Sequence, residues 1–157
     1  MTGAAGFIGS NVVKALLRGF EGVSVVGVDN MDAYYDLSLK ESRLSELLEH
    51  ESFTFYRGDI SDSAFLDDVF EGFRPDYVLN LAAKVGVRHS VLHPEDYIST
   101  NINGFFNVLE ACRKHEVKHL VYASSSSVYG ANADIPYSTD AKTDSPMSLY
   151  GIGRAHV

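Results

Sequence analysis

The chain begins with "MTGAAGFIGSNVV" at residues 1–13, where Gly3, Gly6 and Gly9 recur at every third position. Glycine has no Cβ atom, so such a run permits a tight turn and lets backbone N–H groups approach a pyrophosphate at the first turn of a helix. A turn of this kind normally follows a β-strand, yet only two residues precede Gly3. By itself the run is a weak signal, because ordinary turns also use glycine.

Composition and charge describe a globular chain of one domain. Its 157 residues are 45% hydrophobic and suffice to bury about two thirds of the unfolded surface. Thirteen basic and 21 acidic residues give a net charge of −8, and no stretch gathers lysine and arginine, so we expect no nucleic-acid partner. Cys112 is the only cysteine, which excludes an internal disulfide. With neither a signal peptide nor a membrane span visible, we expect a cytoplasmic location and no membrane partner.

Strand-like and helix-like segments alternate along the chain. The expected strands are 23–29, 53–59, 76–83 and 119–125, and the expected helices are 11–20, 38–50, 63–73 and 94–116. The third of these helices should be capped near Ser61 or Asp62. This alternation predicts an α/β fold, a Rossmann-like doubly wound parallel sheet with helices on both faces. Residues 129–157 are rich in turn-forming residues and are expected to form a long loop.

In a doubly wound sheet the ligand lies beyond the carboxyl ends of the strands. Asp29 ends the strand at 23–29 and stands 20 residues after Gly9, where a carboxylate can accept hydrogen bonds from an adenosine ribose. The same carboxylate would repel a 2′-phosphate, so we expect NAD in preference to NADP. The alternative, an ordinary turn aspartate, requires that the glycine spacing is also accidental.

Two further strand ends fit the same ligand. Asp59 and Ile60 follow the strand at 53–59, where an adenine ring could be bracketed, and residues 80–83 are mostly small enough to let a cofactor lie close. Each position alone is explained more simply by turn or packing chemistry. Their joint placement favours a dinucleotide site.

The motifs together resemble the NAD-dependent epimerase/dehydratase family, the extended short-chain dehydrogenases that act on nucleotide sugars. They are "TGAAGFIG", Asp29, "GDI", "NLAA", "NINGFFNVLEAC", "SSSSVYG" and "SPMSLYG", and they occur in the family's order and spacing over residues 2–150. The stretch "VDNMDAYYDLSLKESRL" is similar to one in UDP-glucuronate 4-epimerases. The resemblance assigns NAD binding to Gly3, Gly6, Phe7, Ile8, Gly9, Asp29, Asn30, Asp59, Ile60, Leu81, Ala82, Ala83 and Asn101.

Family members carry a strand ahead of the glycine turn and a substrate domain after the cofactor domain. The resemblance therefore implies that residues 1–157 are an N-terminal fragment, an NAD(P)-binding Rossmann domain that lacks most of its first strand. The C-terminal substrate domain is expected to be absent. The closing "GIGRAHV" departs from the family pattern, which suggests a truncated or frame-shifted end.

By the same resemblance, Ser125 and Tyr150 are the catalytic residues. The family's tyrosine removes a hydroxyl proton from the sugar while NAD⁺ takes the hydride from the same carbon. Its pKa of about 10 must be lowered by nearby positive charge, which the family supplies with a lysine four residues later. Here that position holds Arg154, which preserves the charge but not the compact ammonium, so we do not expect full activity.

The reaction type is inferred from Ser126 and Ser127. Related dehydratases carry an Asp-Glu pair at these positions and decarboxylases a glutamate, so two serines favour epimerisation over elimination. We expect C4 epimerisation of UDP-glucuronate or a related UDP-hexose through a 4-keto intermediate, by a full-length homodimer. The alternative for the serine run is an ordinary polar loop that says nothing about the reaction. The alternatives for the protein are a dehydratase or decarboxylase of the same family and a non-catalytic NAD-binding remnant.

Two histidine pairs, 89/93 and 115/119, have a spacing that metal sites also use. Pro94 interrupts the first pair, and a strand is expected to begin within the second. We therefore expect surface histidines and no metal.

Overall fold

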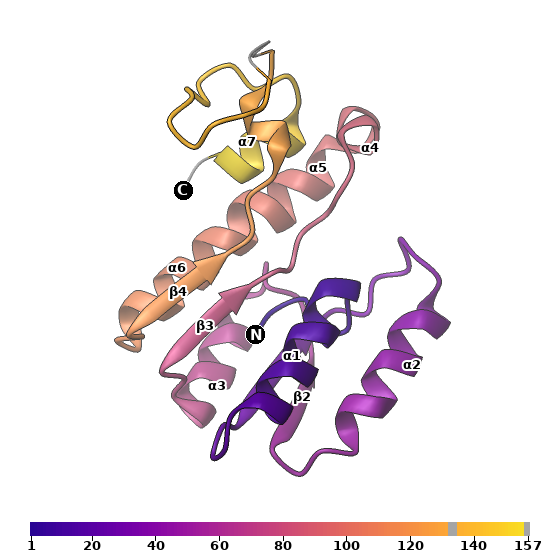
Figure 1. Ribbon diagram of the computed structural model, residues 1–157, viewed down its shortest axis with the longest axis vertical. Coiled ribbons are helices and arrows are strands. Elements are labelled where there is room, and N and C mark those ends of the chain that lie inside the picture. The colour runs from indigo at the N-terminus through magenta and orange to yellow at the C-terminus, as the bar shows by residue number, and fades with distance from the viewer. Residues whose placement is uncertain (132–134, 156–157) are drawn as a thin grey trace.

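A parallel sheet forms the centre of the computed structural model, which describes residues 1–131 and 135–155 (Figure 1). Strand β1 (Val25–Asp29) pairs with β2 (Phe53–Arg57), and β3 (Tyr77–Asn80) pairs with β4 (His119–Tyr122), both in parallel. Isolated parallel bridges join Thr2 to one strand of each pair. The order is therefore β2–β1–Thr2–β3–β4, and the prediction of a doubly wound parallel sheet is confirmed.

Residues 1–2 occupy the position of a central strand between β1 and β3. The amino group of Met1 donates to the carbonyl of Val26 at 2.7 Å, and the N–H of Thr2 donates to the carbonyl of Leu79 at 3.0 Å. Beside them, an apolar cleft of about 830 Å³ separates the two strand pairs, with Val26 on one wall and Val78 on the other. Met1 and Thr2 line this cleft together with residues of both strand pairs.

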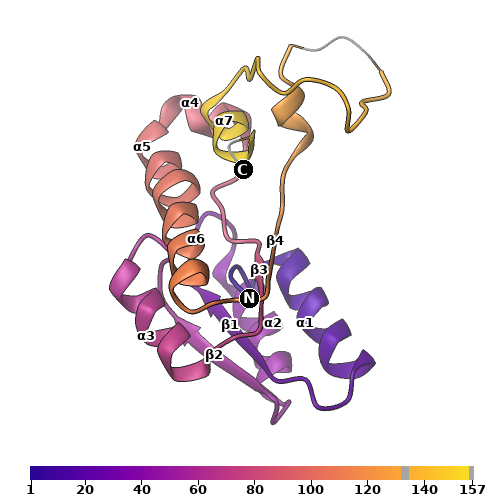
Figure 2. The same ribbon diagram turned by 90° about the vertical axis from the view of Figure 1, so that its left-hand side faces the viewer.

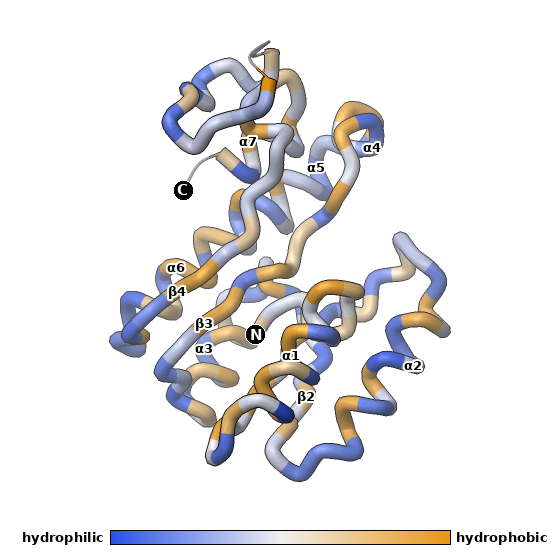
Figure 3. Tube along the Cα trace, in the orientation of Figure 1, coloured by the Kyte–Doolittle hydropathy of each residue, from blue (hydrophilic) through white to orange (hydrophobic). Residues whose placement is uncertain are grey.

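Helices cover both faces of the sheet (Figures 1 and 2). Helices α1 (Phe7–Gly19) and α2 (Leu37–Leu48) lie on one face, and α3 (Ser63–Phe73) and α6 (Phe105–Lys114) on the other. Hydrophobic and hydrophilic residues alternate along α1 and α2 in Figure 3, as expected for helices with one buried side. Val13, Val25, Leu47 and Phe53 form the core under the first pair, and Leu66, Phe70, Val78 and Val108 form the core under the second.

The helix starts follow from local sequence. The carboxylate of Asp62 accepts a hydrogen bond from the N–H of Phe65 at 3.0 Å and caps α3, so the prediction of a cap near Ser61 or Asp62 is confirmed. Asp36 caps α2 in the same way through the N–H of Ser38, at 2.9 Å.

The expected helix at 94–116 is interrupted in its middle. It begins as α5 (Pro94–Tyr97), continues as the π-helix η1 (Ile98–Gly104) and ends as α6. A Cβ atom on Gly104 would lie 2.6 Å from Cγ1 of Ile60, so glycine allows the helix to pack closely against the end of β2. π-Helical turns are frequent at functional sites, and this one carries Asn101.

The prediction of a loop throughout residues 129–157 is wrong at its end, where α7 (Leu149–Ala155) forms. Helix propensity is low in "LYGIGRA", but close packing requires the glycines: a Cβ atom on Gly151 would lie 2.8 Å from the carbonyl of Ser127. The other helices are the 3₁₀-helix η2 (Ser126–Tyr129) and α4 (Val87–Leu92). The rest of the expected loop includes residues 132–134, and the expected tail includes 156–157; both lie outside the described residues. Within the described residues, no helix is both long and apolar enough to cross a membrane.

Candidate cofactor and catalytic site

A cleft of about 500 Å³ lies at the carboxyl ends of the strands. Twelve of the predicted cofactor-binding residues line it: Gly3, Gly6, Phe7, Ile8, Gly9, Asp29, Asn30, Asp59, Ile60, Leu81, Ala82 and Ala83. Tyr150 and Arg154 line the same cleft, whereas Asn101 and Ser125 do not. The chain therefore brings the predicted cofactor residues and the predicted catalytic tyrosine into one continuous space.

The glycine turn has no room for side chains. Gly3 has a left-handed φ of 68°, and a Cβ atom on it would lie 2.8 Å from the backbone nitrogen of Ala82. A Cβ atom on Gly9 would lie 2.1 Å from the carbonyl oxygen of Gly3. The turn leads directly into α1, whose first N–H groups have no partner within the helix. Its compact backbone and free donors suit an anion such as a pyrophosphate.

Asp29 is buried at the end of β1, and its carboxylate accepts three hydrogen bonds. One oxygen, Oδ2, accepts from the N–H of Ala5 at 3.1 Å; the other, Oδ1, accepts from the N–H of Met31 at 2.9 Å and from Nζ of Lys40 at 3.0 Å. The Lys40 side chain is only 13% exposed, so this ion pair is largely shielded from water. Sequence reasoning missed Lys40, because a lysine 11 residues after Asp29 on a charged helix looks like a solvated surface residue.

Asp59 and Asn30 join the ends of β2 and β1. The amide of Asn30 donates to Oδ2 of Asp59 at 2.7 Å, while Ser61 donates to Oδ1 through its N–H at 2.9 Å and its hydroxyl at 2.7 Å. Burial opposes ionisation of Asp59, but these hydrogen bonds outweigh it and lower the pKa of the carboxyl. An anionic acceptor is therefore held at this end of the cleft.

Asn101 acts on the cleft through another residue. Its Oδ1 accepts from the N–H of Lys84 at 2.8 Å, and its Nδ2 donates to the carbonyl of Lys84 at 2.9 Å. Asn101 is buried and fixes the backbone of the segment after β3, whose residues Lys84 and Val85 line the cleft. Direct contact between Asn101 and a cofactor stays a prediction.

Tyr150 lines the same cleft, beside a buried positive charge. The guanidinium carbon of Arg154 lies 6.0 Å from the centre of the Tyr150 ring, and Nη1 donates to the carbonyl of Ala123 at 3.0 Å. Arg154 is 8% exposed, and its Nε has no hydrogen-bond partner among the described residues. Burial lowers the pKa of the guanidinium, an effect that Tyr150 partly opposes.

The predicted catalytic Ser125 is turned towards its own loop. Its hydroxyl oxygen accepts from the N–H of Ser127 at 3.2 Å and caps the short helix η2. Ser124, the preceding residue, lines the cleft and donates from its hydroxyl to the carbonyl of Arg154 at 3.0 Å. The catalytic role of Ser125 stays a prediction.

The histidines are only partly the surface residues that the sequence predicted. His93 is exposed, but His89 is half-buried, with its ring 4.4 Å from the His93 ring and 5.1 Å from the Tyr34 ring. No group of three or more histidine, cysteine or acidic side chains suited to a metal ion occurs in the part of the chain that the structure describes.

Comparison with known proteins agrees with this geometry. Residues 1–157 match the sequence family described as GDP-mannose 4,6 dehydratase. The chain is 47% identical over 150 residues to protein CapI of Staphylococcus aureus, across 96% of this chain and 44% of CapI. It is 46% identical over 151 residues to UDP-glucuronate 4-epimerase 3 of Arabidopsis thaliana, across 96% of this chain and 34% of that epimerase.

A solved structure extends the match to three dimensions. A mutant UDP-glucuronic acid 4-epimerase of Bacillus cereus, crystallised with NAD and UDP-4-deoxy-4-fluoro-glucuronic acid, has a TM-score of 0.84 and 34% identity. The match covers 98% of this chain and 47% of that epimerase. The chain thus spans less than half the length of these relatives. The resemblance inferred from the motifs is confirmed, and the chain belongs to the NAD-dependent epimerase/dehydratase family of nucleotide-sugar enzymes.

Proposed function

We propose that the chain is the NAD-binding part of a longer nucleotide-sugar 4-epimerase, completed by a separate C-terminal substrate domain, that acts on UDP-glucuronate or a related UDP-hexose. One observation carries the proposal: a single cleft is lined both by Asp29 and Lys40 and by Tyr150 and Arg154. The 46% identity to an enzyme named UDP-glucuronate 4-epimerase supports the choice of sugar.

The residues of the cleft fit NAD. The side-chain-free turn at Gly3 and Gly9 leaves space and backbone donors for the pyrophosphate, and the paired charges of Asp29 and Lys40 suit a ribose diol. When bound, NAD⁺ accepts a hydride from C4 of the sugar and later returns it to the opposite face.

The end of the cleft near Tyr150 supports proton transfer. In the proposal, Tyr150 takes the proton of the C4 hydroxyl, which requires that its pKa falls towards neutrality. The Arg154 guanidinium, 6.0 Å from the Tyr150 ring, favours the phenolate in the way that a neighbouring cation does. Ser125 would hydrogen-bond the reacting hydroxyl after a rotation of its side chain away from Ser127.

Epimerisation fits this end of the cleft better than elimination does. The carboxylates that line the cleft are Asp29, Asp32 and Asp59, on the loops after β1 and β2, while the loop after β4 contributes Ala123 and Ser124. Without a carboxylate beside Tyr150, no group in the described part of the cleft is placed to remove the C5 proton. A dehydratase remains the second candidate, because the matched family is described as GDP-mannose 4,6 dehydratase.

The proposal includes a homodimer in the cytoplasm. Four apolar side chains along η1 and α6 are 38–59% exposed and form a stripe on the outer side of the helix: Ile98, Ile102, Phe106 and Leu109. An apolar stripe of this kind is typical of helix-mediated association. Cys112, the only cysteine of the chain, is free and buried, which suits a protein of a reducing compartment.

Product analysis tests the proposal. The parent protein, meaning the longer epimerase of which this chain is the proposed NAD-binding part, is incubated with UDP-glucuronate and NAD. The nucleotide sugar is then analysed by mass spectrometry and NMR. We expect an epimer of unchanged mass and no net consumption of NAD. A product lighter than the substrate by one water molecule would show that the protein is a dehydratase. A product lighter by one carbon dioxide would show that it is a decarboxylase. Binding of NAD without any turnover would identify a non-catalytic remnant, with Arg154 in place of the family's lysine as its cause.

A further inference from the structure

The loop between β1 and α2 reaches across the cleft to the segment that follows β3. Nζ of Lys84 lies 2.8 Å from Oδ2 of Asp32, and the two side chains are only 18% and 33% exposed. Both residues line the cleft that holds the glycine turn. The ion pair therefore joins the two halves of the sheet on the cofactor side.

Hydrogen bonds hold the Asp32 end of this ion pair in place. The N–H of Asp32 donates to Oδ1 of Asn30 at 3.0 Å, and Oδ1 of Asp32 accepts from the N–H of Tyr34 at 2.8 Å. Burial opposes ionisation of Asp32, but the hydrogen bonds from Lys84 and Tyr34 outweigh it and lower the pKa of the carboxyl. The loop is thus shaped to present a carboxylate anion to Lys84.

The other end of the ion pair is equally constrained. Asn101 binds both the N–H and the carbonyl of Lys84, so the backbone that carries the ammonium is fixed to η1. The backbone on each side of the ion pair is therefore held by hydrogen bonds of its own. To separate the two charges, either the side chains must rotate or the hydrogen bonds that shape the loop must break.

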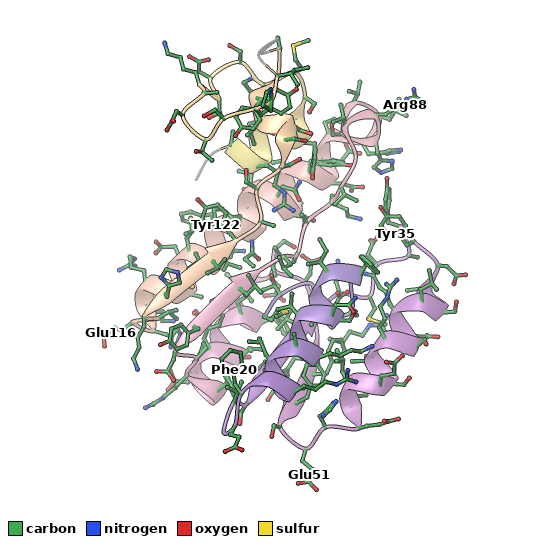
Figure 4. All side chains as sticks on the ribbon, viewed as in Figure 1. Phe20, Tyr35, Glu51, Arg88, Glu116 and Tyr122 are labelled. Carbon is green, nitrogen blue, oxygen red and sulfur yellow. The ribbon has the colours of Figure 1, made fainter. Side chains whose placement is uncertain are left out.

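A second contact between the same two segments lies farther along. The rings of Tyr34 and His89 meet edge to face at 5.1 Å, and His89 is itself supported by His93, 4.4 Å away. Figure 4 shows the neighbours of this contact, Tyr35 on the loop and Arg88 on α4, at the same edge of the molecule. Two independent contacts therefore tie residues 32–34 to residues 84–89.

The position of this connection suggests its role. β1 and β3 flank Thr2, and the glycine turn follows directly from Thr2, so the turn and the linked loops after β1 and β3 enclose one shared space, the cleft that all three line. In the proposed function that space holds the pyrophosphate of the dinucleotide. A bound dinucleotide would then be enclosed between the turn below and the connected loops above.

We propose that the Asp32–Lys84 ion pair, with the Tyr34–His89 contact, forms a clasp that retains the dinucleotide and sets its rate of release. The inference rests on the proposed function, because it takes the ligand to be NAD. Cofactor release requires the clasp to open, so loss of the ion pair should accelerate dissociation while leaving the glycine turn and the Asp29–Lys40 pair intact.

The test is a charge-reversal cycle read as the rate of NAD dissociation, measured by stopped-flow fluorescence on the 157-residue chain. We expect Asp32→Asn and Lys84→Gln each to raise the rate by up to about fivefold. The double variant Asp32→Lys/Lys84→Asp should restore most of the slow release, because it rebuilds the pair with the charges exchanged. Glu46→Gln is the matched control, since it removes the Lys14–Glu46 ion pair between α1 and α2, at 2.5 Å, and should leave the rate unchanged.

The single variants also separate the clasp from a direct role of Lys84. If Lys84 instead binds the phosphates itself, Asp32→Asn frees its ammonium and slows the release of NAD, which would overturn the clasp. Unchanged release in both single variants would overturn it too. If the wild-type chain does not bind NAD, the proposed function fails and the clasp with it; binding with unaltered release defeats the clasp alone.

A measurement on the wild-type chain covers the case in which a variant does not fold. Hydrogen–deuterium exchange should slow together in residues 30–35 and 84–89 when NAD is added, because a closed clasp protects both segments at once. Protection of one segment without the other would contradict the proposal.

Discussion

Gly9 is the position in the glycine turn where a single added methyl group meets the nearest backbone atom. A Cβ atom there would lie 2.1 Å from the carbonyl oxygen of Gly3, 2.9 Å from its carbonyl carbon and 3.0 Å from Cα of Ala4. All three are backbone atoms, so no side-chain rotation can relieve the clash, and the glycine turn must move by about 1 Å to reach van der Waals distance. That movement strains the hydrogen bond from the N–H of Gly6 to the carbonyl of Gly3, at 3.1 Å.

The expected cost of Gly9→Ala follows from these contacts. Overpacking costs about 1–3 kcal/mol and a weakened backbone hydrogen bond about 1 kcal/mol, against a gain of about 1 kcal/mol in helix propensity. A net loss of about 1–3 kcal/mol corresponds to a fall in Tm of roughly 3–10 °C for a chain of this size. NAD binding should weaken as well, because the displaced turn no longer presents its N–H groups.

Gly19→Ala provides the matched control for Gly9→Ala. Gly19 lies in the same helix α1, and nothing lies within 4 Å of a Cβ atom placed on it, so the substitution should be neutral or slightly stabilising. Thermal unfolding followed by circular dichroism and fluorescence titration with NAD measure both effects. Equal Tm and equal NAD affinity in the two alanine variants would refute the argument that the turn is packed against its own backbone.

Three further predictions concern charge and proton transfer. Lys40→Met leaves the buried Asp29 carboxylate without its counter-charge, and it should weaken NAD binding at least tenfold in fluorescence titration. The affinity for NADP should fall by a larger factor than the affinity for NAD, and an equal fall for both cofactors would contradict this. Burial lowers the pKa of the Met1 amino group from 8.0 to about 6, so the unfolded chain binds more protons between these values. The free energy of unfolding should rise by about 2 kcal/mol from pH 6 to pH 8 in urea unfolding of the 157-residue chain, and N-acetylation should remove that slope. In the parent protein, Tyr150→Phe should abolish epimerisation with NAD affinity unchanged; residual turnover would exclude Tyr150 as the base.

The sheet and most of the cleft could be predicted from sequence because their determinants are local. Strand ends, helix caps and glycine turns depend on residues a few positions apart. Asp29, Asp59 and the turn at Gly3 could therefore be proposed together from their places after the expected strands, and the family resemblance assigned them to NAD. The helix α7 could not be predicted in this way. Its sequence has low propensity, and it forms because Gly151 and Gly153 pack against Ser127 and Asn101, far earlier in the chain.

The residues missed in the site share a different property. Lys40 and Lys84 have no motif of their own, and each acquires its significance from a carboxylate that only the fold brings near: Asp29 for Lys40 and Asp32 for Lys84. Sequence periodicity describes which residues share a face, but it does not pair a charge on one loop with a charge 52 positions away. Such pairs can be recognised only when the topology of the sheet is known.

The two strand pairs also explain why cofactor binding and folding should be coupled in this chain. β1 and β2 form one pair and β3 and β4 the other, and between them lie the bridges of Thr2 and an apolar cleft of about 830 Å³. A ligand that contacts the glycine turn, Asp29 and the segment after β3 touches both halves at once. Its binding free energy therefore adds to the free energy that keeps the halves together, since a ligand that binds only the folded state stabilises it by mass action. The same geometry makes the Asp32–Lys84 pair more than a local contact, because it connects the loop after β1 with the segment after β3 and so joins the two strand pairs.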